Sequence, residues 1–241
     1  MNDILSRHDK IALQFSGGRD SLACLYLLKP YWDRLTVYWC NTGAAYPETL
    51  AMIEEVRAMV PHFAEIQGNQ PAVIEQFGLP SDMVPVSATP VGLAVINGGS
   101  VLMQDRYSCC IRSMNVPTHV RMIEDGITLV IRGQKNADRL KAPMRSGHIE
   151  DGIEYLFPIE DWDAKRVMGY LAKQGASIPR FYEMMNNAPD CMTCSAYWED
   201  GAGAYLKRYH HIEFKEYQRR LDIIAKAVGG HIAAFNQEIA S

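Results

Sequence analysis

Apolar and polar positions change pattern several times along the chain, and the changes predict strands that alternate with helices. Residues 11–15 (IALQF) form a short apolar run, which is typical of a buried parallel strand. From 20 to 28 the apolar residues recur at helical spacing. A second strand is predicted over 35–40 (LTVYWC), and a helix is expected to begin at Pro47, because proline suits the first turn of a helix.

The rest of the chain continues this alternation less regularly. The predicted strands are 63–67, 127–133 and 154–159, and the predicted helices are 161–174 and 203–226. Residues 68–100, with four prolines and a Gly-Gly pair, are expected to form loops and short helices. We therefore expect an α/β fold with a doubly wound, mostly parallel sheet in a domain over 1–160, and a helical C-terminal region over 161–241.

The composition is that of an ordinary globular protein. Of the 241 residues 48% are hydrophobic and 22% charged, and the formal net charge of −4 argues against a broad basic coat for nucleic acid. No stretch approaches the roughly 18 apolar residues that span a bilayer, and the first ten residues lack the apolar core of a signal peptide. We therefore expect a cytoplasmic protein with no membrane partner.

The sequence SGGRDS, residues 16–21, lies between the first predicted strand and the first predicted helix. It matches neither the Walker pattern nor the dinucleotide fingerprint. Its chemistry still suits an anion, because glycines let the backbone approach a ligand and the amides at a helix start point toward it. Ser16 and Ser21 can donate hydroxyl groups, and Arg19 adds charge. The alternative is a glycine turn capped by Ser or Asp.

Three segments, in the same order, resemble a known family. FSGGRDS resembles the pyrophosphate loop of the N-type ATP pyrophosphatases and of the adenylyl-sulfate and phosphoadenylyl-sulfate reductases, although Arg19 stands where lysine is usual. WCNTGAAYPET (39–49) is similar to the family's Asp-Thr-Gly and Phe-Pro-Glu-Thr, with Asn41 in place of the common Asp. IRGQKNADR (131–139) is similar to the Gly-x-Arg segment of the reductases. The resemblance implies the PP-loop, adenine nucleotide α-hydrolase-like fold.

The resemblance also implies a nucleotide site at the carboxyl ends of parallel strands, with the phosphates on 16–21 and adenine near 41–43. The implied nucleotide-binding residues are Ser16, Gly17, Gly18, Arg19, Asp20, Ser21, Asn41, Thr42, Gly43, Arg132 and Gly133. The catalytic candidates are Arg19, Asp20, Lys135 and Arg139. Two of these, Lys135 and Arg139, can instead belong to a solvated basic face, and Glu48 can simply favour a helix start.

Four of the six cysteines form two pairs, Cys109-Cys110 and Cys191-x-x-Cys194. In a reducing compartment such clusters bind metal or do chemistry more often than they form disulfides. Adjacent side chains diverge, which suits a [4Fe–4S] cluster, with a separate iron for each thiolate, better than a single zinc ion. Zinc and buried structural thiols are the alternatives. The spacing is similar to the cluster-binding pattern of the adenylyl-sulfate reductases, in which a cation, here Arg112, also follows the pair.

The reductases of this family use a further cysteine near the C-terminus as nucleophile, and this sequence has no cysteine after Cys194. Cys24 and Cys40 are interpreted as core residues and therefore as poor substitutes. We favour an enzyme of ATP- or adenylyl-dependent sulfur chemistry. The alternatives are a sulfonucleotide reductase whose thiol is supplied elsewhere, and a non-catalytic sensor of nucleotide and cluster.

The expected cofactors are a [4Fe–4S] cluster, or zinc, and ATP or adenylyl sulfate. The sequence leaves open whether Mg²⁺ accompanies the nucleotide, whether a sulfur or electron donor protein or a nucleic-acid acceptor takes part, and whether the chain forms oligomers. Basic residues at 207–211 are interpreted as a solvated helix face.

Overall fold

The computed structural model describes residues 1–95, 101–138, 141–187, 189–198 and 201–241. The chain forms two compact units, each assembled from separate stretches of sequence. The first unit contains Met1–Asn41, Tyr46–Gln67 and Pro117–Arg180, and the second contains Thr42–Ala45, Gly68–Val116 and Phe181–Ser241. The chain thus passes between the units several times, whereas the predicted division after residue 160 has one boundary.

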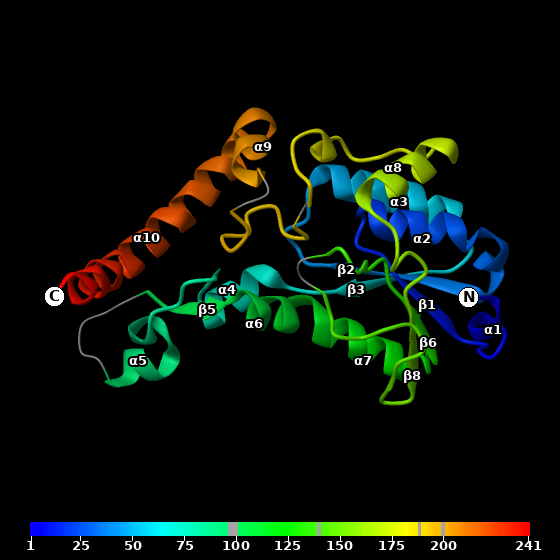
Figure 1. Cartoon of the computed structure of the whole chain (residues 1–241), viewed down its shortest axis with the longest axis horizontal. Helices are drawn as coiled ribbons and strands as arrows, with labels where there is room; N and C mark the ends of the chain where they lie inside the picture. Colours follow the sequence, from blue (N-terminus) through cyan, green and yellow to red (C-terminus); the bar gives the residue numbers. More distant parts are fainter. Residues whose placement is uncertain (96–100, 139–140, 188, 199–200) are drawn as a thin grey trace. The chain divides into compact units, whose positions relative to one another are not determined.

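The first unit is built on a six-stranded sheet in the order β3-β2-β1-β6-β8-β7 (Figure 1). Its strands are β1 Ile11–Gln14, β2 Leu35–Asn41, β3 Phe63–Gln67, β6 Leu129–Ile131, β7 Ile149–Glu150 and β8 Ile153–Leu156. Neighbouring strands are parallel except at the edge, where β7 pairs antiparallel with β8. The predicted mostly parallel α/β sheet is therefore confirmed.

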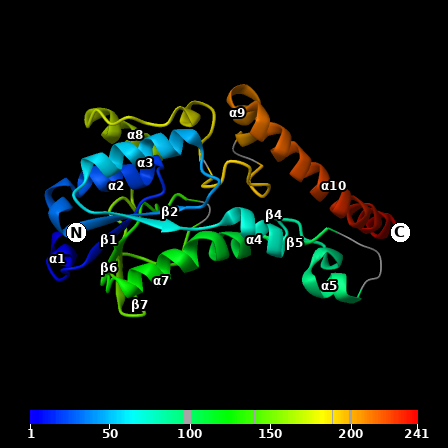
Figure 2. The same cartoon turned by 180° about the vertical axis from the view of Figure 1, so that it is seen from behind.

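Helices cover both faces of this sheet. They are α1 Asn2–Leu5, the 3₁₀ helix η1 Lys29–Arg34, α2 Arg19–Leu27, α3 Pro47–Met59, α7 Val116–Glu124 and α8 Ala164–Lys173. Helices α2, α3 and α8 lie on one face and α7 on the other (Figures 1 and 2). Because both faces are buried, the central strands β1 and β6 are almost continuously apolar rather than alternating.

The core on the α7 side follows from the strand register. Ala12, Val130 and Tyr155 are aligned across β1, β6 and β8, so their side chains share one face. Together with Met122 of α7 they belong to one buried apolar cluster. This packing fixes the relative positions of the carboxyl ends of the central strands.

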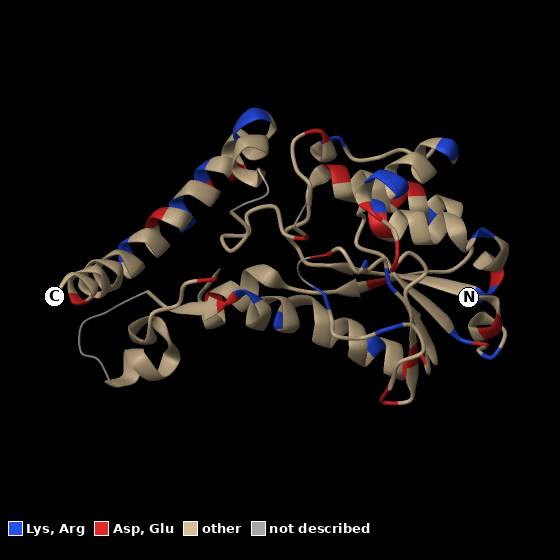
Figure 3. Ribbon diagram, in the orientation of Figure 1, with Lys and Arg blue, Asp and Glu red and all other residues tan. Residues whose placement is uncertain are grey.

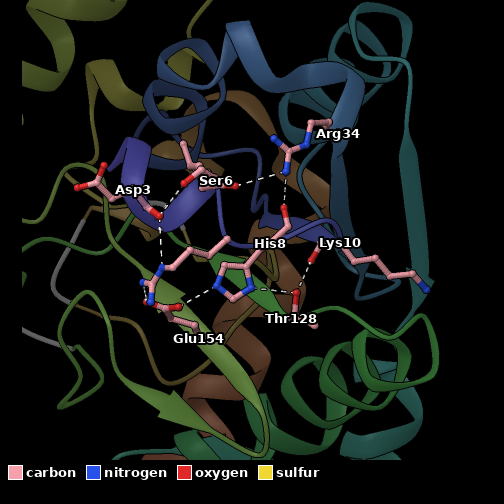
Figure 4. A network of polar contacts seen from close by, with 9 residues as sticks. Asp3, Ser6, His8, Lys10, Arg34, Thr128 and Glu154 are labelled. Atoms are coloured by element: carbon pink, nitrogen blue, oxygen red, sulfur yellow. Dashed lines mark hydrogen bonds and ion pairs between the residues drawn. The ribbon is translucent and has the colours of Figure 1, made fainter.

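A polar network holds the segment after α1 against the sheet (Figure 4). Glu154 of β8 is 5% exposed and accepts hydrogen bonds from Arg7 Nη2 at 2.7 Å and His8 Nε2 at 2.8 Å. The other ring nitrogen of His8 lies 3.0 Å from Thr128 Oγ1. A buried carboxylate needs such partners, so these contacts satisfy Glu154 and anchor the preceding segment.

The second unit contains a two-stranded parallel sheet and mostly helices. Its elements are α4 Gln70–Phe77, β4 Leu79–Ser81, η2 Val86–Ala88, α5 Pro90–Val95, β5 Met103–Asp105, α6 Arg106–Cys110, the π-helical turn η3 Ile111–Asn115, α9 Ala202–Tyr209 and α10 His211–Ala240, and η4 Arg180–Glu183 begins at the end of the first unit. Strands β4 and β5 were not predicted, because three residues are too few to show a period. The single helix predicted over 203–226 is two helices with a break at His210.

The long helix α10 is anchored at its middle. Ile224 and Val228 pack with Leu79, Met103 and Ala88 in the apolar cluster of this unit. Basic and acidic residues are interspersed along the helix (Figure 3). None of the helices in the described residues is long and apolar enough to cross a membrane.

Candidate functional site

The order of the strands reverses between β1 and β6, which lie side by side in the sheet. From β1 the chain continues to β2 and β3 on one side, whereas β6 lies on the other side. Open α/β sheets bind ligands at the carboxyl ends of strands where the order reverses. Residues 16–21 follow β1 and Arg132 follows β6, so both predicted segments lie at this edge.

The loop after β1 is shaped by its own hydroxyl groups. Gly17 has φ +76°, a left-handed conformation that suits glycine. Ser21, 4% exposed, donates to the carbonyl of Gly18 at 3.0 Å and accepts from the Ser16 N–H at 3.3 Å. Helix α2 begins after Gly18, and no side chain in the described part of the chain caps it. Its amino end is therefore suited to an anion.

Two glycines allow close packing around this loop. A Cβ at Gly17 would lie 2.7 Å from Thr49 Cγ2, and a Cβ at Gly133 would lie 2.7 Å from the backbone of Asp20 and of Ser21. The segment after β6 therefore runs directly against the first turn of α2. A side chain at position 133 would displace backbone, not merely another side chain.

Lys135 is buried between two carboxylates. Its side chain is 5% exposed, and Nζ lies 2.6 Å from Asp20 Oδ2 and 3.0 Å from Asp138 Oδ1. The other oxygen of Asp138 accepts the Lys135 backbone N–H at 2.7 Å. Lys135 thus belongs to an internal ion-pair network and not to a solvated face. Sequence analysis missed Asp138, whose partner is recognisable only after folding.

Two groups at this edge have no partner among the described residues, the second oxygen of Asp20 and the guanidinium of Arg132. Asp20 Oδ1 is buried without a hydrogen bond to any described residue. Burial lowers the pKa of Arg132, and no carboxylate among the described residues pairs with the guanidinium. A partly buried cation without a counter-charge is unfavourable, so an anion is favoured beside Arg132.

Asn41 ends β2 and donates from Nδ2 to Glu65 Oε1 at 2.9 Å. This bond is the largest cause of a lowered pKa at Glu65, and Arg57, 2.6 Å away, contributes in the same direction. An aspartate at position 41 would face the Glu65 carboxylate. The local electrostatics therefore explain why asparagine stands where the similar family usually has aspartate.

The candidate Arg139 lies outside the described residues.

Thr42 and Gly43 begin the second unit in a turn, residues 42–45. The carbonyl of Thr42 accepts the Gln70 N–H at 2.9 Å, and the carbonyl of Ala44 accepts the Met192 N–H at 2.7 Å. Burial raises the pKa of Cys191, and a hydrogen bond with Thr42 opposes this rise. The turn predicted to lie near adenine is therefore bonded to the Cys-x-x-Cys segment.

The four paired cysteines lie in one electrostatic environment of the second unit. Burial raises the pKa of Cys109 to about 11 and that of Cys110 to about 12, and it also raises the pKa values of Cys191 and Cys194. A thiolate at Cys194 would raise the pKa of each of the other three further. Unliganded, these thiols stay protonated at neutral pH, and coordination of a metal would deprotonate them.

Three arginines oppose these effects from different elements. Arg106 opposes the rise in the pKa of Cys110 and of Cys194. Arg112 and Arg220 oppose the rise at Cys109, and Arg220 also acts on Cys194. Asp82 and the Tyr197 ring hold Arg106, and Gln104 holds Arg112. Glu216 and the Thr193 carbonyl hold Arg220. Of the three, only Arg112 closely follows the Cys109-Cys110 pair in the sequence, which is the signal that marked it; Arg106 precedes the pair and Arg220 lies far along the chain.

The donor set fits an iron–sulfur cluster in its chemistry. Four thiols suit a soft metal, and the nearby arginines suit the net negative charge of a cluster held by four thiolates, whereas hard cations prefer oxygen. Over the ranges of the chain that are described, no group of three or more His, Cys, Asp or Glu side chains is arranged to hold a metal ion.

The expected core residue Cys24 is fully buried, and Cys40 is partly buried against the core.

A hollow of about 700 Å³ lies at the opposite edge of the first unit, by the amino ends of the strands. Lys10, Tyr38, Arg121 and Asp125 line it. Tyr38 Oη donates to Asp125 at 2.6 Å and Arg121 Nε to the same oxygen at 2.8 Å. This carboxylate is satisfied within the protein, in contrast to Asp20 at the carboxyl edge.

Comparison with known proteins gives similarity in structure but not in sequence. No model of a known family matches the sequence, and no curated protein matches it significantly. The structure resembles phosphoadenylyl-sulfate (PAPS) reductase from Candida auris, solved as a phosphate complex, with a TM-score of 0.56 and 14% identity over 78% of this chain and 85% of that one. This likeness shows the adenine nucleotide α-hydrolase-like fold.

Two further solved structures of the PP-loop type are more distant. Yeast FAD synthetase in complex with FAD has a TM-score of 0.45 and 10% identity, over 76% of this chain and 56% of that one. The U34-tRNA thiolase NcsA from Methanococcus maripaludis with its [4Fe–4S] cluster has a TM-score of 0.43 and 15% identity, over 88% of this chain and 72% of that one.

Proposed function

Because the chain has the adenine nucleotide α-hydrolase-like fold, we propose that it is an enzyme that binds an adenine nucleotide through its phosphates at residues 16–21 and uses it in sulfur chemistry. In the favoured form the nucleotide is ATP or an adenylyl group, and Cys109, Cys110, Cys191 and Cys194 hold a [4Fe–4S] cluster. Because thiols stay reduced in the cytoplasm, we infer that location from the six free cysteines.

The observation that carries the proposal is the cation of Arg132. It stands at the edge where the strand order reverses, its pKa is lowered by burial, and no described carboxylate pairs with it. A phosphate group would supply the missing negative charge. Arginine is suited to this, because its planar donors match phosphate oxygens.

The remaining residues of this edge position and neutralise the phosphates. The amino end of α2 presents backbone amides and the positive end of the helix dipole. Lys135 holds Asp20 by one oxygen, which leaves Oδ1 as a candidate ligand for Mg²⁺. Catalysis at such a site is mostly positioning and charge neutralisation.

Cysteine chemistry supports the cluster part of the proposal. A bound cluster would accept or relay sulfur or electrons. The chain's own contribution is to hold the four thiols in one unit, with Arg106, Arg112 and Arg220 balancing their charge. Zinc is the alternative metal. Iron, sulfide and zinc analysis of anaerobically purified protein decides between them, and a zinc-only result would remove the cluster.

The binding test compares two arginines. Arg132→Met is expected to weaken binding of ATP and of pyrophosphate roughly 10- to 100-fold, the range for a hydrogen-bonded charged pair. Arg166→Met, which removes an exposed arginine of α8, should leave both affinities unchanged. Titration calorimetry measures both. Equal affinities for wild type and Arg132→Met would contradict the proposed phosphate site.

A sulfonucleotide reductase with its thiol supplied elsewhere is the second candidate, favoured by the likeness to the Candida auris reductase. Release of pyrophosphate from ATP with Mg²⁺ and a sulfur donor supports the first candidate. Tighter binding of adenylyl sulfate than of ATP, with sulfite release on addition of a dithiol, supports the second. Binding of nucleotide without either product would indicate a sensor.

A further inference from the structure

Arg106 is a buried cation with one donor that the fold does not use. It is the first residue of α6 and is 8% exposed. Its Nη2 forms an ion pair with Asp82. Its Nε is buried as well and has no hydrogen-bond partner in the described part of the chain. Buried N–H groups are nearly always hydrogen-bonded in native proteins, so this one calls for a physical reason.

A second arginine of the same unit shows the ordinary situation. Arg220 is partly buried, and it donates from Nε to Glu216 at 2.8 Å and from Nη1 to the carbonyl of Thr193 at 3.0 Å. Both of these donors hold the structure together. The Nε of Arg106 makes no such contribution, which indicates that it serves a group other than the polypeptide.

Arg106 neighbours both cysteine pairs, and all of these residues belong to the second unit. It stands four residues before Cys110 in α6, and residues three and four apart are neighbours on a helix surface. Its guanidinium lies over the ring of Tyr197, 4.6 Å from the ring centre, and Tyr197 follows Cys194 by three residues. The side chain with the unused donor is therefore placed between the two segments that carry the thiols.

The sulfur of Cys194 already attracts donors from the backbone. Hydrogen bonds from the backbone of Ala196 and of Tyr197 oppose the rise in the pKa of Cys194. Metal-bound thiolates and the sulfides of a cluster are negatively charged and accept such hydrogen bonds. The N–H of a guanidinium is suited to them, because a charged donor makes a stronger hydrogen bond than a neutral one.

We propose that Arg106 donates a hydrogen bond from Nε to a sulfur of the [4Fe–4S] cluster and thereby makes the cluster easier to reduce. The reduced cluster is more negative by one electron, so a hydrogen bond and a positive charge both favour it, and charge and hydrogen bonds to sulfur are known to set such potentials. The inference rests on the proposed function and deepens it, because it assigns control of the potential to one residue outside the ligand set.

The test measures the midpoint potential of the reconstituted protein by anaerobic redox titration. Arg106→Met removes the charge and the donor, so the equilibrium constant for reduction should fall roughly tenfold, the lower end for a hydrogen bond to a charged group. For one electron this is about 59 mV. Arg208→Met, which removes an exposed arginine of α9, should leave the potential unchanged. Equal potentials for wild type and Arg106→Met would overturn the inference.

Arg106→Lys separates the charge from the hydrogen bond. Lysine keeps a positive charge beside Asp82 but has no donor at the position of Nε. Its potential is therefore expected between those of wild type and Arg106→Met. A potential equal to that of wild type would show that charge alone acts and would overturn the assignment of Nε. The same comparison of Arg106→Lys with wild type decides if Arg106→Met does not fold.

Pulsed electron paramagnetic resonance gives a readout that a purely structural role would not move. Protein made with nitrogen-labelled arginine, with its cluster reduced by one electron, should show a weak coupling between the unpaired electron and an arginine nitrogen. The coupling should vanish in Arg106→Lys and persist in Arg208→Met. Its absence in wild type, or its persistence in Arg106→Lys, would contradict the hydrogen bond.

The inference and the proposed function fail separately. If wild type takes up iron and sulfide and Arg106→Met leaves the potential unchanged, the assignment of Arg106 is wrong and the cluster stands. If wild type takes up zinc alone, or no metal, the cluster part of the proposed function fails, and the assignment of Arg106 fails with it.

Discussion

Lys135 Nζ lies 2.6 Å from Asp20 Oδ2, and this ion pair ties the segment after β6 to the first turn of α2. The two residues belong to the two segments that meet where the strand order reverses. Because Lys135 is paired internally, its first role is to position Asp20 and the loop, whereas Arg132 has no carboxylate partner among the described residues.

Replacement of Lys135 by methionine is expected to destabilise the protein. The change leaves the carboxylates of Asp20 and Asp138 without the cation between them. Breaking a buried pair in this way costs about 3 kcal/mol of the free energy of unfolding. Urea denaturation measures it, with Lys173→Met at an exposed position of α8 as control, expected within about 0.5 kcal/mol of wild type. A loss no larger than that of the control would show that Lys135 is not structurally required.

Gly133→Ala should disturb the loop through its backbone. The new Cβ would lie 2.7 Å from the backbone of Asp20 and Ser21, so the start of α2 must shift. We expect a loss of about 1–3 kcal/mol in stability, as for overpacking, and a weaker affinity for pyrophosphate. Gly169→Ala, in α8 with no atom within 4 Å of its added Cβ, should instead stabilise by about 0.5–1 kcal/mol. Chemical denaturation of both variants checks this, and equal effects would contradict the close approach.

Asn41→Asp should lower stability at neutral pH, and the size of the loss should depend on pH. The folded-state pKa of Glu65 is lowered, chiefly by Asn41. The ionised Glu65 carboxylate therefore stabilises the fold above its unfolded pKa of about 4.3, and this stabilisation is lost as the pH falls through the folded pKa. The aspartate replaces a donor by a second carboxylate, and we expect a loss of about 1 kcal/mol at pH 7. The loss should shrink below pH 4, where carboxylates become protonated. Asn41→Ala adds no charge, so its loss of stability should shrink less steeply toward low pH than that of Asn41→Asp. Identical pH profiles of stability for the two variants would refute the explanation for Asn41.

Arg220→Met should loosen metal at the four cysteines. Arg220 donates to the carbonyl of Thr193, between Cys191 and Cys194, and Glu216 orients it. Loss of such an outer contact typically costs about tenfold in metal affinity. Arg219→Met is the matched control, because Arg219 pairs with the same Glu216 but lies largely exposed. Iron loss to a chelator, followed by absorbance after reconstitution, measures the effect. Equal rates for the two variants would remove Arg220 from the site, and a wild type that takes up no iron would remove the cluster itself.

Several features were predictable because they depend on local chemistry. The runs at 11–15 and 35–40 are apolar on both faces and therefore had to be buried strands, and they are β1 and β2. The glycines of residues 16–21 permit the left-handed turn at Gly17 that closes the loop. The cysteine pairs were visible from spacing alone. By contrast, the three-residue strands β4 and β5 carry too short a pattern to be recognised.

By itself, the sequence determined where backbone can be buried and which residue types can meet an anion or a soft metal, because side-chain chemistry and period are local properties. Only the tertiary structure decided which polar groups find partners. It paired Lys135 with Asp20 and bonded Asn41 to Glu65, and it left Arg132 without a carboxylate partner in the part of the chain that is described. The physical reason is that desolvation and counter-charge depend on residues distant in the chain, which are brought together only when the sheet and its helices pack.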